Sequence, residues 1–176
     1  MNIEHQTSNV ERQTSNIKLT LKAWPVIAAA TIGLCYLTQT VAKGFGIELP
    51  DQANIELVER YAGWNKTFIL LCAQVLVLMP AIEELIFRYL LFKLPAKLIT
   101  YRLSLIATAA ISSLLFSAAH YIFQPWPDAA FIALFFFGLA QCWLYKKTAR
   151  LWCAILNHGL FNLTNLVLLF VLPEAA

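Results

Sequence analysis

Residues 67–92 read TFILLCAQVLVLMPAIEELIFRYLLF. The first part of this stretch, residues 67–82, has no charged side chain, whereas the second part carries Glu83, Glu84 and Arg88. A helix of about 20 apolar residues crosses the hydrocarbon core of a bilayer. The stretch therefore predicts a transmembrane helix that carries two acids and one base into the membrane, where ionisable groups line bundle interiors and mark functional sites.

The composition of the whole chain also indicates a membrane protein. Of its 176 residues, 60% are apolar and 13% are charged, and the mean hydropathy is +0.65. Soluble domains are roughly half apolar and about a quarter charged, and disordered chains combine low hydrophobicity with high net charge, so both classes are excluded. The formal net charge is +3, and the 13 Lys and Arg are spread along the chain, which predicts no nucleic-acid partner.

Four further stretches lack Asp, Glu, Lys and Arg, namely residues 23–42, 103–127, 129–145 and 151–173. Lipid offers no hydrogen-bond partners to the backbone, and no alternating ten-residue pattern suggests a barrel. We therefore expect an all-α fold, a polytopic membrane helix bundle with about five transmembrane helices. Residues 1–20 are polar and predict a mobile cytoplasmic tail, and residues 21–176 predict a single transmembrane helical domain.

Positive charges predict the orientation, because cytoplasmic loops are enriched in Lys and Arg. The segments before the first span, between the second and third, and between the fourth and fifth hold nine of the 13 basic residues: Arg12, Lys18, Lys22, Lys93, Lys97, Arg102, Lys146, Lys147 and Arg150. This distribution places the N-terminus in the cytoplasm. We expect a multi-pass integral membrane protein in the lipid bilayer, with a bacterial inner membrane as the default location.

Spacing sorts the three charges of the second span. Glu84 and Arg88 are four residues apart, so they share one helix face, with the acid N-terminal to the base. Arg stays protonated, which predicts an ion pair that keeps Glu84 ionised. Glu83 is rotated by roughly 100° from Glu84 and is left available for chemistry. A structural alternative is that both acids only neutralise Arg88 or cap the span near the interface.

Two other spans carry polar groups at membrane depth. An isolated histidine such as His120 is more often a satisfied core residue than a catalytic one. His158 and Asn162 are four residues apart, a pattern that a hydrogen-bonded helix seam also explains. Together with Glu83, however, two imidazoles and an amide supply a base, an acid and an oxyanion donor for the hydrolysis of a carbonyl compound.

The depths of the two histidines differ along their spans. At 1.5 Å per residue, His120 lies about 25 Å from Leu103, at the cytoplasmic end of its span, whereas His158 lies about 10 Å from Leu151. Tilted helices, or a third span that begins later than Leu103, are needed to bring the two imidazoles together.

Three short motifs follow one another on three polar-bearing spans. Residues 83–88 (EELIFR) match E-E-x-x-x-R, residues 116–120 (FSAAH) match F-x-x-x-H, and residues 158–162 (HGLFN) match H-x-x-x-N. In this order they resemble the CAAX protease and bacteriocin-processing enzyme family, which includes the type II CAAX prenyl endopeptidases. The resemblance covers about residues 67–165. The chain is shorter than the larger prenyl endopeptidases of that family.

The resemblance implies an intramembrane endopeptidase. By motif position, Glu83 is the catalytic glutamate and acts with His120 to activate water. His158 and Asn162 stabilise the tetrahedral oxyanion.

The resemblance also implies that Glu84 and Arg88 form a supporting ion pair, and it leaves the catalytic type open. Family members have been described both as metalloproteases and as metal-free glutamic proteases. Zinc accepts two His, a Glu and water, and a metal-dependent enzyme would use Glu83, His120 and His158. H-E-x-x-H is absent, and one helix cannot supply both histidines. We favour a glutamic mechanism without a cofactor, with zinc as the alternative.

The expected substrate is a membrane-anchored peptide, either a prenylated peptide or a C-terminal sorting peptide. Two other classes of protein compete with the protease. One is a non-catalytic membrane immunity or binding protein that retains the protease fold. The other is a proton-coupled carrier that relays protons through Glu83, His120 and His158, although five spans without an inverted repeat disfavour it.

Overall fold

The computed structural model describes residues 3–49, 60–63, 65–98, 102–122 and 128–171. The regular elements within these ranges are helical and include no strand, which confirms the all-α prediction. In chain order they are α1 (Ile3–Gly44), α3 (Lys66–Ala73), η1 (Gln74–Leu78), α4 (Met79–Glu84), η2 (Leu85–Lys93), α5 (Leu94–Leu98), α6 (Arg102–Ala119), η3 (His120–Ile122), α7 (Ala130–Thr148) and α8 (Leu151–Val171).

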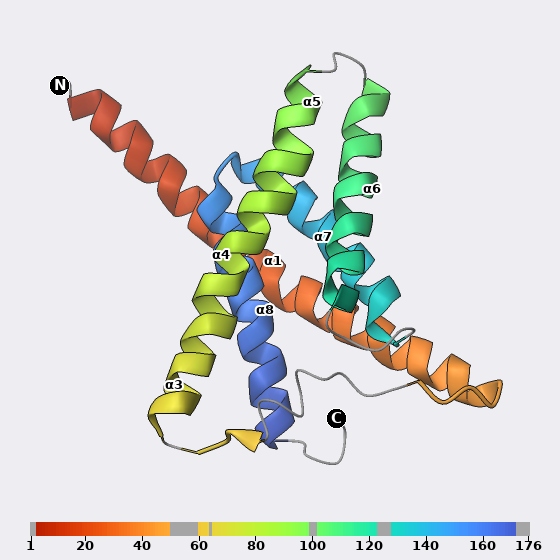
Figure 1. Ribbon diagram of the computed structural model, residues 1–176. Coiled ribbons are helices and arrows are strands. Elements are labelled where there is room, and N and C mark those ends of the chain that lie inside the picture. Colours follow the sequence, from red (N-terminus) through yellow and green to blue (C-terminus); the bar gives the residue numbers. More distant parts are fainter. Residues whose placement is uncertain (1–2, 50–59, 64, 99–101, 123–127, 172–176) are drawn as a thin grey trace.

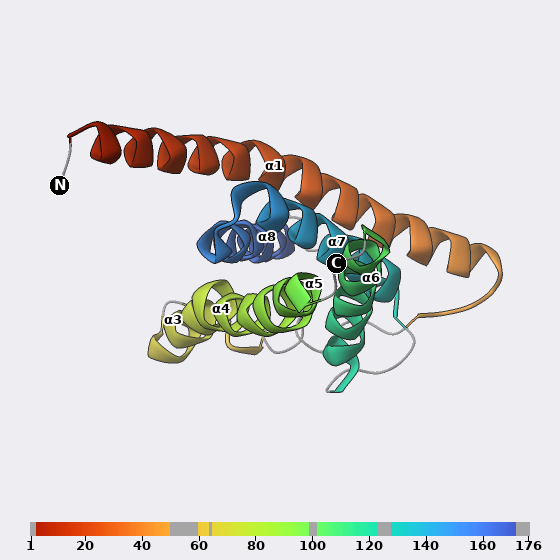
Figure 2. The ribbon, with the colours of Figure 1, turned by 90° about the horizontal axis from the view of Figure 1, so that it is seen from above.

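Helices α7 and α8 lie at the centre of the bundle. Figure 2 shows α1 across one side of this pair and α3, α4 and α5 on the other side. α1 packs against both α7 and α8, and α6 packs against α7 and η2. The core between them contains the buried side chains of Phe116, Phe137, Leu144 and Phe161.

Four helices in the described part of the chain are long and apolar enough to cross a membrane: Asn9–Gly44, Lys66–Leu98, Leu105–Ile122 and Leu151–Val171. The fourth expected span is α7, which has 19 residues and ends in Lys146 and Lys147. It is the more deeply enclosed central helix, because nine of its residues are buried against five in α8. The bundle therefore has four to five helices able to span a bilayer, and the protein is an integral membrane protein.

The expected mobile tail is helical. α1 begins at Ile3 and runs without a break into the first span, because residues 3–20 contain neither Pro nor Gly to end a helix. Asn16 and Thr20 are buried, and the side-chain amide of Asn16 donates to the carbonyl oxygen of Thr148 at 3.4 Å. The last turns of this segment therefore pack on the membrane domain.

The long hairpin of the second and third spans resolves the difference in depth between the histidines. α5 and α6 stand side by side and extend beyond α7 and α8 (Figure 1). α6 begins at Arg102, but its first turns belong to this projection. As a result, the ring of Phe116 reaches the level of His158, and the two ring centroids are 5.8 Å apart.

Two glycines let central helices approach their neighbours closely. A Cβ atom on Gly159 of α8 would lie 2.5 Å from the carbonyl oxygen of Leu76 in η1. A Cβ atom on Gly138 of α7 would lie 2.8 Å from the Cβ of Ser113 in α6. Small residues at helix interfaces are the usual way for membrane helices to pack closely.

We therefore expect Gly159→Ala to destabilise the protein. The added methyl group meets a backbone carbonyl that cannot rotate away, and overpacking of this kind costs about 1 to 3 kcal/mol. The matched control is Gly33→Ala, because a Cβ at Gly33 meets nothing within 4 Å and alanine favours the helix by roughly 0.5 to 1 kcal/mol. Thermal unfolding of both purified variants measures the difference, and equal midpoints would contradict the close approach of α8 to η1.

Candidate active site

The predicted ion pair between Glu84 and Arg88 is present at the centre of the bundle. Arg88 Nε lies 3.0 Å from Glu84 Oε2, and both side chains are fully buried. The guanidinium also lies over the ring of Phe116, with 4.5 Å between Cζ and the ring centroid. A cation at this depth is stabilised by a counter-charge and by the face of an aromatic ring.

His158 joins the two adjacent acids. Its Nδ1 lies 2.9 Å from Glu84 Oε1, and its Nε2 lies 3.6 Å from Glu83 Oε2. Glu83 makes no ion pair with Arg88 among the described residues, as its rotation about the helix predicts. The shared contact with His158 was not predicted, and it arises because α8 packs against α4 and presents its imidazole to both carboxylates.

The partners of His158 decide where its protons lie. Nδ1 of His158 lies within hydrogen-bond distance of Glu84 Oε1, and a carboxylate paired with an arginine is an acceptor of hydrogen bonds. This pairing favours the form of His158 in which Nδ1 is the donor to Glu84. Nε2 is the nitrogen that faces Glu83, at a distance slightly longer than a direct hydrogen bond. The order of contacts is thus Arg88, Glu84, His158, Glu83, which we call the charged chain.

His120 lies at the other side of Phe116. Its Nδ1 lies 2.8 Å from the carbonyl oxygen of Phe116, and the two ring centroids are 4.7 Å apart. Because a carbonyl oxygen only accepts, Nδ1 is the donor in this contact. Within the described residues, His120 makes no hydrogen bond with Glu83, so the structure does not show the predicted direct partnership of these two residues.

Asn162 has a structural partner that the sequence did not indicate. In the π-helical turn η1, the Met79 amide donates to the carbonyl of Gln74, and the next residue, Pro80, has no amide hydrogen. The carbonyl oxygen of Val75 is therefore left without these backbone donors. Asn162 Nδ2 donates to it at 2.9 Å. One N–H of the Asn162 amide is used in this way, and the other remains for a second acceptor.

Aromatic side chains form the frame of the site, which sequence reasoning did not foresee. The ring of Phe137 lies 5.1 Å from that of His158 and 5.9 Å from that of Phe116. Phe116 thus contacts the guanidinium and both imidazoles. The F-x-x-x-H motif contains Phe116 but gives no sign that its ring is shared by three helices. Among many apolar residues in these spans, Phe137 carries no distinguishing signal.

A zinc site requires three or four ligands around one point. No group of three His, Cys, Asp or Glu side chains in the part of the chain that the structure describes is placed to hold a metal ion. Both nitrogens of His158 face carboxylates, and Nδ1 of His120 faces a backbone carbonyl. Within the described residues, Glu83, His120 and His158 therefore do not form such a group.

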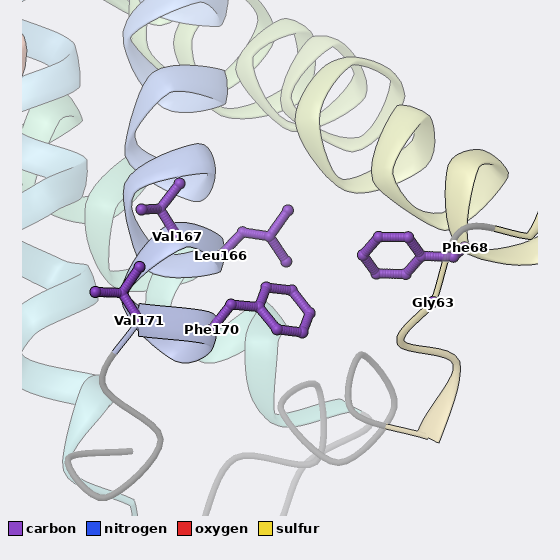
Figure 3. Close-up of a pocket in the computed structure, with 6 residues that line it drawn as sticks. All are labelled: Gly63, Phe68, Leu166, Val167, Phe170 and Val171. Atoms are coloured by element: carbon purple, nitrogen blue, oxygen red, sulfur yellow. The ribbon is translucent and has the colours of Figure 1, made fainter.

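A separate apolar hollow of about 470 Å³ lies between the start of α3 and the end of α8. It is lined by Gly63, Phe68, Leu166, Val167, Phe170 and Val171. Leu166 and Phe170 point from α8 toward Phe68 (Figure 3). Val167 follows His158 by nine residues, or about 13 Å along the helix, so this hollow is distinct from the charged chain and offers no catalytic groups.

Comparison with known protein families finds a match. A family model described as type II CAAX prenyl endopeptidase Rce1-like matches residues 65–164, more than half of the chain. The chain belongs to the Rce1-like family. No curated protein and no solved structure matches it. The Rce1-like match includes every residue of the charged chain together with His120 and Asn162, and it leaves α1 outside.

Membership of the Rce1-like family identifies the protein as a CAAX-type intramembrane protease. Such an endopeptidase acts on membrane-associated substrates within a bilayer.

We expect Arg88→Ala to lower the free energy of unfolding by about 3 to 5 kcal/mol, because it leaves Glu84 as a buried charge without its main partner. The double variant Glu84→Gln/Arg88→Met removes both charges and is expected to recover much of that loss. Thermal unfolding in detergent measures both variants. An Arg88→Ala protein as stable as the wild type would show that the pair does not support the fold.

Proposed function

We propose that the protein is a glutamic-type intramembrane endopeptidase in which Glu83 activates water to hydrolyse a peptide bond. The observation that carries the proposal is the charged chain. It places a partly exposed carboxylate next to an imidazole whose other nitrogen is held by a buried carboxylate. A histidine fixed between two acids is the kind of arrangement that orders proton transfer in hydrolases.

The charges of the chain support Glu83 as the base. The chain contains two carboxylates, one guanidinium and one imidazole, so a doubly protonated His158 would balance the charge of Glu83 inside the bundle. The side chain of Glu83 is 19% exposed, whereas those of Glu84 and Arg88 are fully buried. Glu83 is therefore the carboxylate that a water molecule reaches.

In the proposed reaction, the water oxygen bonds to the substrate carbonyl carbon while Glu83 takes one proton of the water. The carbonyl oxygen becomes an oxyanion, for which Nε2–H of His158 and the second N–H of Asn162 are the proposed donors. The C–N bond then breaks and the leaving amine takes up a proton. That proton comes from Glu83, and we propose that His120 assists its transfer once substrate brings the two side chains together.

We propose membrane-anchored peptides as substrates, either prenylated or C-terminal sorting peptides, and a bacterial inner membrane as the location. Family membership and the four helices able to span a bilayer support action on a substrate held in the membrane. The lipid-anchored end of such a peptide keeps its cleavage site near the interface.

Glu83→Gln is expected to abolish cleavage of a co-expressed membrane-anchored peptide, because a neutral amide does not take a proton from water; the loss should be about 100-fold or more. Product is measured by mass spectrometry in membranes with equal amounts of folded protein. The matched control is Glu11→Gln, an exposed position on α1, which should cleave like the wild type.

Unchanged cleavage by well-folded Glu83→Gln would remove Glu83 from the reaction. A wild-type protein that cleaves no candidate peptide but is crosslinked to a membrane partner would instead support the non-catalytic binding or immunity protein.

Chelation tests the catalytic type independently. Because the described ligand types do not gather around one point, we expect the purified enzyme to keep its activity after dialysis against a strong zinc chelator. Loss of activity that added zinc restores would favour the metal-dependent alternative and would require His120 and His158 to rearrange.

A further inference from the structure

Two buried amides on the central helices are not used by the proposed reaction. Gln141 of α7 and Asn157 of α8 are fully buried. No side-chain nitrogen or oxygen of either residue has a hydrogen-bond partner in the part of the chain that the structure describes. An unsatisfied buried polar group costs about 1 to 3 kcal/mol, and buried polar groups are normally paired with protein or with ordered water.

Gln141 lies on the side of α7 that α1 covers. Three residues further along α7, Leu144 belongs to the core cluster that contains Ala23 and Ile27 of α1. At the end of α7, seven residues after Gln141, the carbonyl oxygen of Thr148 accepts from the Asn16 amide of α1. Residues three and seven apart share a helix face.

Asn157 lies on the corresponding side of α8. Seven residues further along, Thr164 Oγ1 accepts a hydrogen bond from Trp24 Nε1 of α1 at 3.1 Å. Between the two α1 contacts, at Asn16 and Trp24, lies Thr20, which is fully buried. The hydroxyl of Thr20 donates to the carbonyl of Asn16 at 2.9 Å, so its oxygen is still able to accept.

The two amides also lie at one depth, because α7 and α8 are antiparallel neighbours joined by a two-residue turn. Near them, the rings of Phe137 and Phe161 have centroids 4.5 Å apart, and Ala154 and Cys142 belong to one buried cluster. Gln141 and Asn157 each precede a residue that bonds to α1 by seven positions, and this spacing places both amides on the helix faces toward the junction of α1, α7 and α8.

We propose that Thr20, Gln141 and Asn157 enclose an internal water site at this junction. A buried water makes about three hydrogen bonds, and two amides with a hydroxyl oxygen offer both donors and acceptors for it. Thr20, which α1 contributes to the site, lies outside the family match, which begins at residue 65. Gln141 and Asn157 lie within the match.

The purpose of this water rests on the proposed function. Hydrolysis inside a bundle consumes water that lipid does not supply. Asn157 directly precedes His158 on α8, so the water site lies one helical position from the imidazole of the proposed reaction, and we infer that it holds water for that reaction.

Radiolytic hydroxyl-radical footprinting of the full chain in lipid nanodiscs tests the site without an activity assay. Radiolysis of bound water oxidises neighbouring side chains even where bulk solvent has no access. We expect oxidation of Leu144 and Phe161, which are 0% and 8% exposed. Labelling of these residues should fall severalfold in Gln141→Leu and Asn157→Leu.

The matched control is Thr31→Val on α1. Thr31 is also a buried polar residue, 6% exposed, but its hydroxyl donates within its own helix to the carbonyl of Ile27 at 2.8 Å. Removal of this hydroxyl should leave the labelling of Leu144 and Phe161 unchanged.

Absence of labelling at both residues in the wild type would overturn the water site, and this result needs no variant to fold. Unchanged labelling in both leucine variants would overturn it as well. Glu83→Gln separates this proposal from the proposed function, because it should abolish cleavage and leave the labelling intact. Labelling without any cleavage by the wild type would contradict only the protease.

Discussion

The buried guanidinium of Arg88 imposes the constraint on which the rest of the site depends. Water does not reach it, and it cannot lose its charge, so the protein must supply a counter-charge one helical turn away at Glu84. The remaining oxygen of Glu84 then needs a donor, which His158 provides from another helix. The second nitrogen of that imidazole is thereby aimed at Glu83. The need to neutralise buried Arg88 thus leads, through Glu84 and His158, to the partly exposed carboxylate of Glu83.

Irregular helical segments position the charged chain. α4 is a short regular segment between two π-helical turns, and such turns are frequent where a helix carries function. The turn before α4 leaves the Val75 carbonyl unpaired, and Asn162 satisfies it from α8. Gly159 allows the same two segments to meet closely. Three features therefore hold His158 against both acids: the missing amide hydrogen of Pro80, the side-chain amide of Asn162 and the absence of a side chain at Gly159.

The helical spans, the ion pair and the family were predictable from the sequence. Charge-free stretches gave the helical spans, the four-residue spacing gave the pair of Glu84 and Arg88, and three motifs gave the family. Contacts between different helices could not be predicted, because spacing within one helix does not determine how that helix packs against another. The segment before residue 20 was predicted as a tail because it is polar; the structure makes it the first part of α1, and its Asn16 has a partner on α7. The second acceptor role of Glu84 depends on the packing of α8 and has no local signal.

Nitrogen-15 NMR of the histidine side chains tests the charged chain most directly. The protein has three histidines, so the signal of His158 is assigned by a single replacement of each of the other two. We expect Nδ1 of His158 to be protonated in the wild type, because ionised Glu84 accepts its hydrogen. The Nδ1 signal should move in Glu84→Gln and should stay in place in Glu11→Gln. A wild-type His158 whose Nδ1 carries no proton would contradict the role of Glu84 and, with it, the order of the chain from Arg88 to Glu83.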